Sequence, residues 1–158
     1  MRFLIKRIYE PAAETDGFRV LVDRLWPRGV SKAKAKLDIW MPDVGPSTAL
    51  RQWFDHDPVR WTEFRGRYHA ELKKKAALLA TIKRQTQKGP VTLLYSAKDE
   101  RHNQAVALRS LLTNQAVLLR RKRRYVPEGA RRKAKSNATL GGKERVAAVH
   151  PDSRHGKR

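Results

Sequence analysis

The chain has 158 residues, with 36 Lys and Arg against 15 Asp and Glu, and its formal net charge is +21. This length suits one domain with a real hydrophobic core. The chain has no cysteine, which excludes disulfides, zinc–thiolate sites and thiol nucleophiles. Its apolar stretches are too short for a secretory signal or a membrane span, so we expect a cytoplasmic protein with no membrane partner.

The positive charge is concentrated near the end of the chain. Residues 120–158 hold 14 basic and 3 acidic residues, a formal net charge of +11. Segments of low hydrophobicity and high net charge cannot bury enough apolar surface to offset the entropy of ordering. We therefore predict a domain over residues 1–119 and a disordered basic tail over residues 120–158, with a transient helix around residues 128–135.

Three segments have the composition of β-strands: residues 2–9, 18–24 and 91–96. The second and third contain continuous apolar runs, which are typical of strands buried on both faces of a parallel sheet. Pro27 and Gly29 end the second strand, because proline lacks a ladder donor and glycine permits a sharp turn. Residues 32–36 alternate Lys with Ala and predict an exposed loop or turn.

Residues typical of helix ends predict helices between the second and third strands. Ser47 is a predicted N-cap for a helix that carries Leu50 and Phe54. Asp57 as N-cap, Pro58 after it and Gly89 beyond the end predict one long amphipathic helix between them.

A third helix is predicted over about residues 101–113. Residues 116–119 form either a short final strand or only a last apolar contact. Strands that alternate with helices predict an α/β fold, a three-layer sandwich with a small, mostly parallel sheet flanked by helices.

Several segments of this sequence resemble the YeaO-like family, which is domain of unknown function 488. They are IKRIYEP (5–11), DGFRVLVDRLWPRG (16–29), WMPDVGPSTALRQWFDHDP (40–58) and VTLLYSAKDERHNQA (91–105). The match runs in order and spacing from residue 2 to about residue 115. The resemblance implies a three-layer α/β fold and a bacterial cytosolic protein, and it implies no reaction.

The resemblance also implies that more distant members of this group carry a cysteine near the end of the third strand and a Cys-His-Arg at the following helix. In this chain Tyr95 and Ser96 stand near the strand end, and residues 101–103 are Arg, His and Asn. Any cysteine chemistry of those relatives therefore does not transfer to this chain.

Polar residues follow the ends of the second and third predicted strands. In open parallel sheets, ligands bind beyond the carboxyl ends of the strands, so two neighbouring strand ends would share one crevice. The predicted ligand-binding residues are Arg24, Arg28, Lys98 and Asn103. Their charge, together with free N–H groups at the start of the next helix, favours a small anion such as a phosphate or nucleotide.

Catalysis at the same crevice would fall to Asp23 or Asp99 as base and to His102 as acid or base. The alternative is that Asp23 and Arg24 form a structural ion pair and that Asp99 only caps a helix. No phosphate loop or nucleophile elbow is present, so the sequence leaves open whether the protein is an enzyme and which cofactor it uses. Asp55, His56 and Asp57 are adjacent and would not converge on one metal ion, so we expect no metal site.

The basic tail predicts contact with DNA or RNA without sequence preference, because Lys and Arg neutralise phosphates and release counterions. The alternative is a solvated extension with no selected function, and the oligomeric state stays open. The predicted nucleic-acid-binding residues are Arg120, Arg121, Lys122, Arg123, Arg124, Arg131, Arg132 and Lys133.

Overall fold

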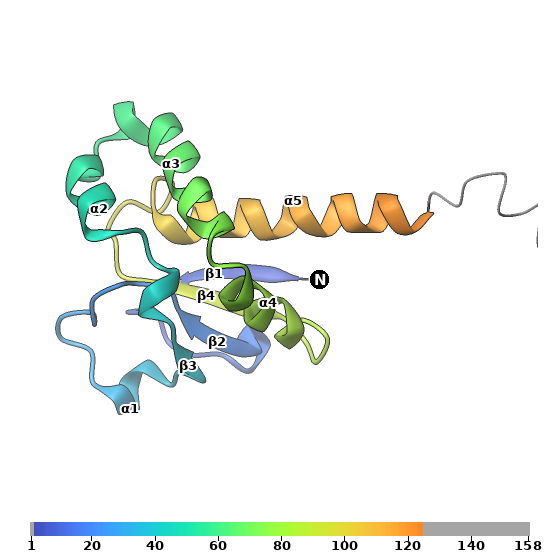
Figure 1. Cartoon of the computed structure of the whole chain (residues 1–158). Coiled ribbons are helices and arrows are strands. Elements are labelled where there is room, and N and C mark those ends of the chain that lie inside the picture. Colours follow the sequence, from blue (N-terminus) through green and yellow to red (C-terminus); the bar gives the residue numbers. More distant parts are fainter. Residues whose placement is uncertain (1, 125–158) are drawn as a thin grey trace, which may run out of the picture. The chain divides into compact units, whose positions relative to one another are not determined.

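The computed structural model describes the backbone of residues 2–124 and the side chains of residues 2–115 (Figure 1). Its four strands are β1 (Phe3–Arg7), β2 (Phe18–Leu21), β3 (Ile39–Trp40) and β4 (Val91–Tyr95). They form one sheet in the order β1-β4-β2-β3, and every pairing between them is parallel. The three predicted strands and their parallel pairing are therefore confirmed.

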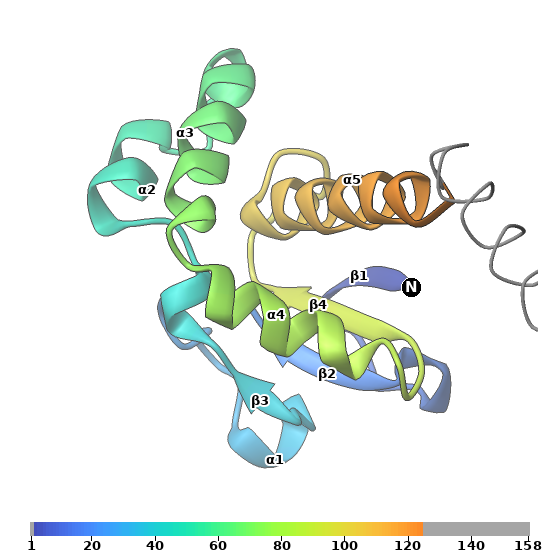
Figure 2. The same ribbon diagram turned by 45° about the vertical axis from the view of Figure 1, so that its right-hand side comes forward.

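The helices lie on both faces of this sheet. They are α1 (Lys32–Ala35), α2 (Thr48–Phe54), α3 (Trp61–Lys73), α4 (Ala76–Gln85) and α5 (Gln104–Arg124). Figure 2 shows α4 running along the sheet in front of β4 and β2. The compact unit extends from Met1 to Arg120. The predicted three-layer α/β architecture is confirmed.

The two faces of the sheet have cores of different size. On one face Val20 and Leu93 pack in a large cluster with apolar side chains of α2, α3, α4 and α5. On the other face Leu21 and Leu94 pack with Ala35 of α1 in a much smaller cluster. Since successive residues of a strand point to opposite faces, the continuous apolar runs of β2 and β4 supply both clusters.

A buried ionic network completes the smaller face. The Asp16 carboxylate pairs with the Arg19 guanidinium and, at 3.0 Å, with Lys6 Nζ. Arg19 also donates to the carbonyl oxygens of Ala35 and Lys36, at 3.0 and 2.9 Å. Through Arg19, the network therefore connects the end of α1 to β2.

The helix predicted after Asp57 is wrong in extent, because it consists of three pieces. Asp57 caps a 3₁₀ turn, Pro58–Arg60, and α3 and α4 follow as separate helices. The chain leaves the helical conformation at Lys75, whose Nζ donates to the carbonyl oxygen of Asp43 at 2.6 Å. The break lies inside a segment whose apolar periodicity continues without a gap.

Three local expectations are also corrected. The exposed loop or turn expected over residues 32–36 contains the one-turn helix α1, and β3 was not predicted at all. The possible strand over 116–119 is helical, because the backbone of α5 continues to Arg124. The domain boundary at residue 119 stays a prediction, and the predicted transient helix over 128–135 lies outside the described residues.

Candidate functional site

A pocket of about 330 Å³ opens at the carboxyl edge of the sheet, beyond the ends of β1, β2 and β4. Pockets that hold small ligands usually measure about 300–1,000 Å³. Its wall combines charged, polar and aromatic side chains. They are Tyr9, Asp23, Arg24, Leu25, Trp26, Pro27, Arg28, Pro46, Arg51, Phe54, His56, Phe64, Ser96, Ala97 and Gln104.

Asp23 is the buried polar group of this pocket, with only 6% of its surface exposed. Its Oδ2 accepts hydrogen bonds from the backbone N–H of Ser96, at 3.0 Å, and from the Ser96 hydroxyl. Its Oδ1 accepts a hydrogen bond from the Gln104 side chain at the start of α5. Burial raises the pKa of Asp23, and these hydrogen bonds and the charge of His56 offset the rise only in part.

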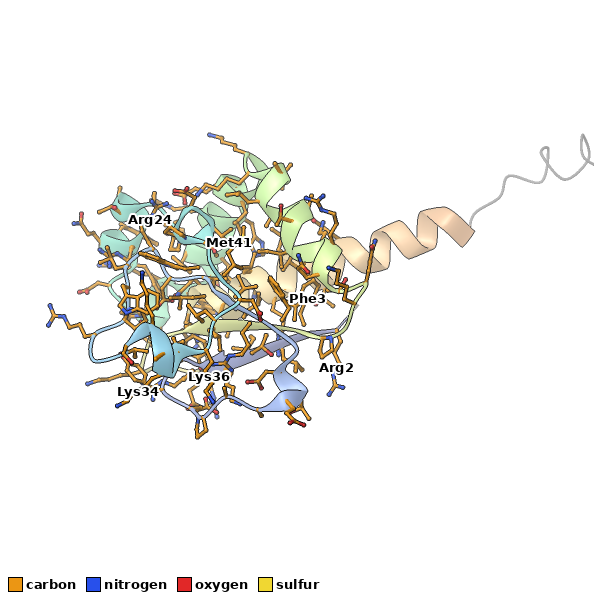
Figure 3. All side chains as sticks on the ribbon, turned by 90° about the horizontal axis from the view of Figure 1, so that it is seen from below. Arg2, Phe3, Arg24, Lys34, Lys36 and Met41 are labelled. Carbon is orange, nitrogen blue, oxygen red and sulfur yellow. The ribbon has the colours of Figure 1, made fainter. Side chains whose placement is uncertain are left out.

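Arg24 follows Asp23, lines the pocket and donates hydrogen bonds to two backbone carbonyl groups. Its Nε donates to the carbonyl oxygen of Pro46 at 2.8 Å, and its Nη2 donates to that of Gly45 at 3.2 Å. Figure 3 shows Arg24 among other side chains near Met41, whereas Arg2 lies at the other end of the sheet. Arg24 therefore belongs to the pocket, with part of its donor capacity used by the backbone.

The exposed basic side chains of the pocket are Arg28, Arg51 and His56. Only Arg28 was predicted as a site residue. Arg51 comes from α2, and His56 follows Asp55 in a turn where both residues have positive φ, 44° and 54°. Such backbone conformations are unusual for residues other than glycine and are enriched at functional sites. The sequence signal that could have found His56 was its place between two acidic residues at a helix end.

The loop that carries Arg28 is held in place by two aromatic side chains. The Trp26 indole donates to the carbonyl oxygen of Val30 at 2.7 Å, which closes the turn through Gly29 at φ 73°. The Tyr9 hydroxyl donates to the carbonyl oxygen of Arg28 at 3.1 Å. Backbone contacts thus fix the loop, and they leave the Arg28 guanidinium to project from a defined position.

The second predicted segment contributes different residues from those expected. Among the described side chains, Lys98, Asp99, His102 and Asn103 lie outside the pocket lining, whereas Ser96, Ala97 and Gln104 lie in it. The predicted roles of these residues stay predictions, without a shared pocket to join them to Arg24 and Arg28.

Asp99 and His102 form their own pair at the turn before α5. The distance from His102 Nδ1 to Asp99 Oδ2 is 2.8 Å, and Asp99 also accepts the backbone N–H groups of Arg101 and His102. The hydrogen bond from His102 is the largest of the effects that lower the pKa of Asp99 to about 2. The His102 ring lies edge-on to Trp61, with the ring centroids 5.3 Å apart.

Neither of the two structural alternatives for these residues is found in its predicted form. Within the described side chains, no ion pair joins Asp23 to Arg24. The cap of α5 is Asn103, which is fully buried and whose Oδ1 accepts the Val106 N–H at 3.1 Å. Asp99 instead closes the turn that precedes the cap.

No group of three or more His, Asp or Glu side chains in residues 2–115 is arranged to hold a metal ion. In the described residues, no helix combines the length and the apolar composition needed to cross a membrane.

The comparison with known families decides the classification. The family model that matches residues 2–131 is described as the inactive DUF488-N3 subclade. This chain belongs to that family. The match extends beyond residue 115, where the resemblance was expected to end, and it includes the first run of basic residues.

Three relatives of this chain carry the name uncharacterized protein. The chain is 45% identical over 111 residues to uncharacterized protein YeaO of Escherichia coli K12. This alignment covers 68% of the chain and 94% of the relative. The chain is 40% identical over 111 residues to Mb3100c of Mycobacterium bovis and to Rv3073c of Mycobacterium tuberculosis. Each of these alignments covers 70% of the chain and 93% of the relative. No solved structure matches the chain.

Proposed function

We propose that this protein binds a small anionic ligand, of phosphate or nucleotide type, in the pocket at the carboxyl edge of the sheet. The observation that carries the proposal is the presence of Arg24, Arg28 and Arg51 in one pocket wall. Guanidinium groups suit bidentate contact with phosphate or carboxylate oxygens. The position of the pocket, beyond the carboxyl ends of parallel strands, is where ligands bind in open α/β sheets.

We propose that the protein binds this ligand without converting it to a product. The description of the subclade as inactive supports it. So does the placement of His102, which pairs with Asp99 outside the pocket lining. A cysteine-free chain fits the reducing cytoplasm, where we place the protein in this proposal.

Titration of the full chain with inorganic phosphate, followed by calorimetry, tests the proposal. Arg28→Gln and Arg51→Gln should each weaken binding roughly tenfold or more, because a hydrogen bond to a charged group contributes about 1.5–3 kcal/mol. Arg65→Gln is the matched control, since Arg65 is exposed on α3 and lies over Trp61. Equal weakening in all three variants, or no binding by the unaltered chain, would reject the pocket as an anion site.

A second candidate function rests on charge alone. The +11 formal charge of residues 120–158 favours non-specific binding of DNA or RNA. We expect dissociation constants on the order of 10⁻⁴–10⁻⁶ M at physiological salt, with binding that weakens steeply as salt rises. A chain that ends at Arg120 should lose this binding, whereas Arg28→Gln should retain it. Equal binding by the shortened chain would assign the interaction to the domain.

A further inference from the structure

The pocket lining has two chemically different parts. Arg28 and Arg51 are exposed, whereas Asp23 is buried and carries the opposite charge when it ionises. An inorganic anion placed against Asp23 would be repelled by the carboxylate. A ligand that uses the whole pocket must therefore present its anionic group to the arginines and a hydrogen-bond donor to Asp23.

The Asp23 carboxylate has capacity for one such donor. Ser96 donates twice to Oδ2, and Gln104 donates once to Oδ1. A carboxylate offers about four lone-pair sites, so one site remains beside the Gln104 contact. Because three protein donors fix the carboxylate in place, the remaining site has a defined direction.

Part of the pocket lining is aromatic. Phe54 and Phe64 are buried and stacked on each other, with their ring centroids 4.1 Å apart, so the accessible aromatic surface is that of Tyr9 and Trp26. Aromatic walls favour flat, unsaturated rings, which gain contact area and stacking energy against them. The complementary ligand is thus a flat ring that bears an N–H donor and is linked to an anionic group.

We propose that the ligand is a nucleoside monophosphate, with its phosphate on Arg28 and Arg51 and an N–H group of its base on Asp23. This inference rests on the proposed anion site and specifies what that site takes. Phosphate contacts supply charge attraction, while the base contact supplies selectivity, since a buried acceptor disfavours ligands that leave it unpaired.

The test compares ligands on the unaltered full chain. The probes are AMP, CMP, GMP, UMP, ribose 5-phosphate and inorganic phosphate, titrated under one set of conditions. At least one nucleotide should bind tenfold or more tightly than ribose 5-phosphate. If ribose 5-phosphate and phosphate bind as tightly as every nucleotide, the base site is overturned and the anion site stands. If none of the six probes binds, both proposals fail.

Asp23→Asn separates the base contact from the phosphate contact. It should weaken the preferred nucleotide about tenfold and leave ribose 5-phosphate binding within a factor of two. Asp43→Asn, at an exposed residue outside the pocket lining, is the matched control and should change neither affinity. A uniform change for nucleotide and ribose 5-phosphate would overturn the base contact. The ranking on the unaltered chain decides the proposal even if the variant fails to fold.

Discussion

The backbone N–H of Ser96 donates to Asp23 Oδ2 at 3.0 Å, so the first residue after β4 is tied to the loop that follows β2. The Ser96 hydroxyl and the Gln104 amide donate to the same carboxylate. One buried side chain therefore joins two strand ends to the start of α5. All three residues line the pocket, so structural support and the proposed ligand contact share one group.

Asp23 should matter to stability as an acceptor more than as a charge. Because burial raises its pKa, ionisation of Asp23 lowers the stability of the fold as pH rises through the pKa values of its unfolded and folded states. Asp23→Asn removes this loss and keeps one acceptor oxygen, so its free energy of unfolding at pH 7 should lie within about 1 kcal/mol of the unaltered value. Asp23→Ala leaves three donors unpaired and should cost about 1–3 kcal/mol. Urea denaturation of both variants measures the difference, and a greater loss for Asp23→Asn would contradict this account.

Gly17 should not tolerate a side chain. Its φ is +63°, and an added Cβ atom would lie 2.2 Å from the carbonyl oxygen of Pro90. This positive φ, combined with a ψ of −134°, is a sparsely populated conformation that costs a non-glycine residue about 1–3 kcal/mol, so Gly17→Ala should lose more than about 2 kcal/mol once the clash is included. Gly66→Ala is the matched control, because nothing lies within 4 Å of its added Cβ on α3. This control should gain about 0.5–1 kcal/mol from helix propensity. Thermal melts of the two variants that shifted in the same direction would refute the prediction.

The buried Asp16–Arg19 pair should be far more important than an exposed pair of the same kind. Asp16→Ala leaves a buried guanidinium without its partner and should cost about 3–5 kcal/mol. Glu63→Ala breaks the exposed Glu63–Arg67 pair on α3 and should cost less than about 1 kcal/mol. Chemical denaturation at pH 7 compares them. Equal losses would mean that the Asp16 network is not the anchor of α1.

The stability contributed by Asp16 should depend on pH in a defined direction. Burial raises the pKa of Asp16, but hydrogen bonds from Ala13, Lys6 and Arg19 outweigh it and hold the pKa below its usual value of 3.8. The stabilisation is therefore complete above about pH 4 and is lost as pH falls through the lower pKa of the folded state. Denaturation curves recorded between pH 5 and pH 2 should show this loss, and Asp16→Asn should flatten it.

The Asp99 carboxylate should titrate at a pKa of about 2, chiefly because of the hydrogen bond from His102. His102→Gln should move its pKa upward, toward the usual value of 3.8. Carbon-detected NMR of the carboxyl groups measures both values. The pKa of Asp16 serves as the internal control, since Asp16 has no contact with this pair and should not respond. An unchanged Asp99 pKa in the variant would show that the backbone N–H groups, and not the imidazole, hold the charge.

Local sequence determined three of the four strands and the caps Ser47 and Asp57, because these features depend on neighbouring residues. The apolar runs of β2 and β4 predicted strands buried on both faces, and Ser47 accepts the Leu50 N–H at 3.2 Å as its capping role required. The alternation of strands and helices was sufficient for the α/β class, since a parallel pairing needs a crossover between its strands.

Only the tertiary structure decided which polar groups meet. Residues 98–103 were placed at the predicted crevice because they follow β4, but the turn after Ala97 directs Asp99 to His102 and leaves Ser96 and Gln104 beside Asp23. Arg51 and His56 reach the pocket from α2 and the turn after it, at a distance in sequence that no strand-end rule covers. The break at Lys75 was not predicted either, because neither glycine nor proline marks it and the apolar periodicity continues through it. Periodicity records which face of an element is buried, whereas the packing of distant elements fixes where each side chain ends.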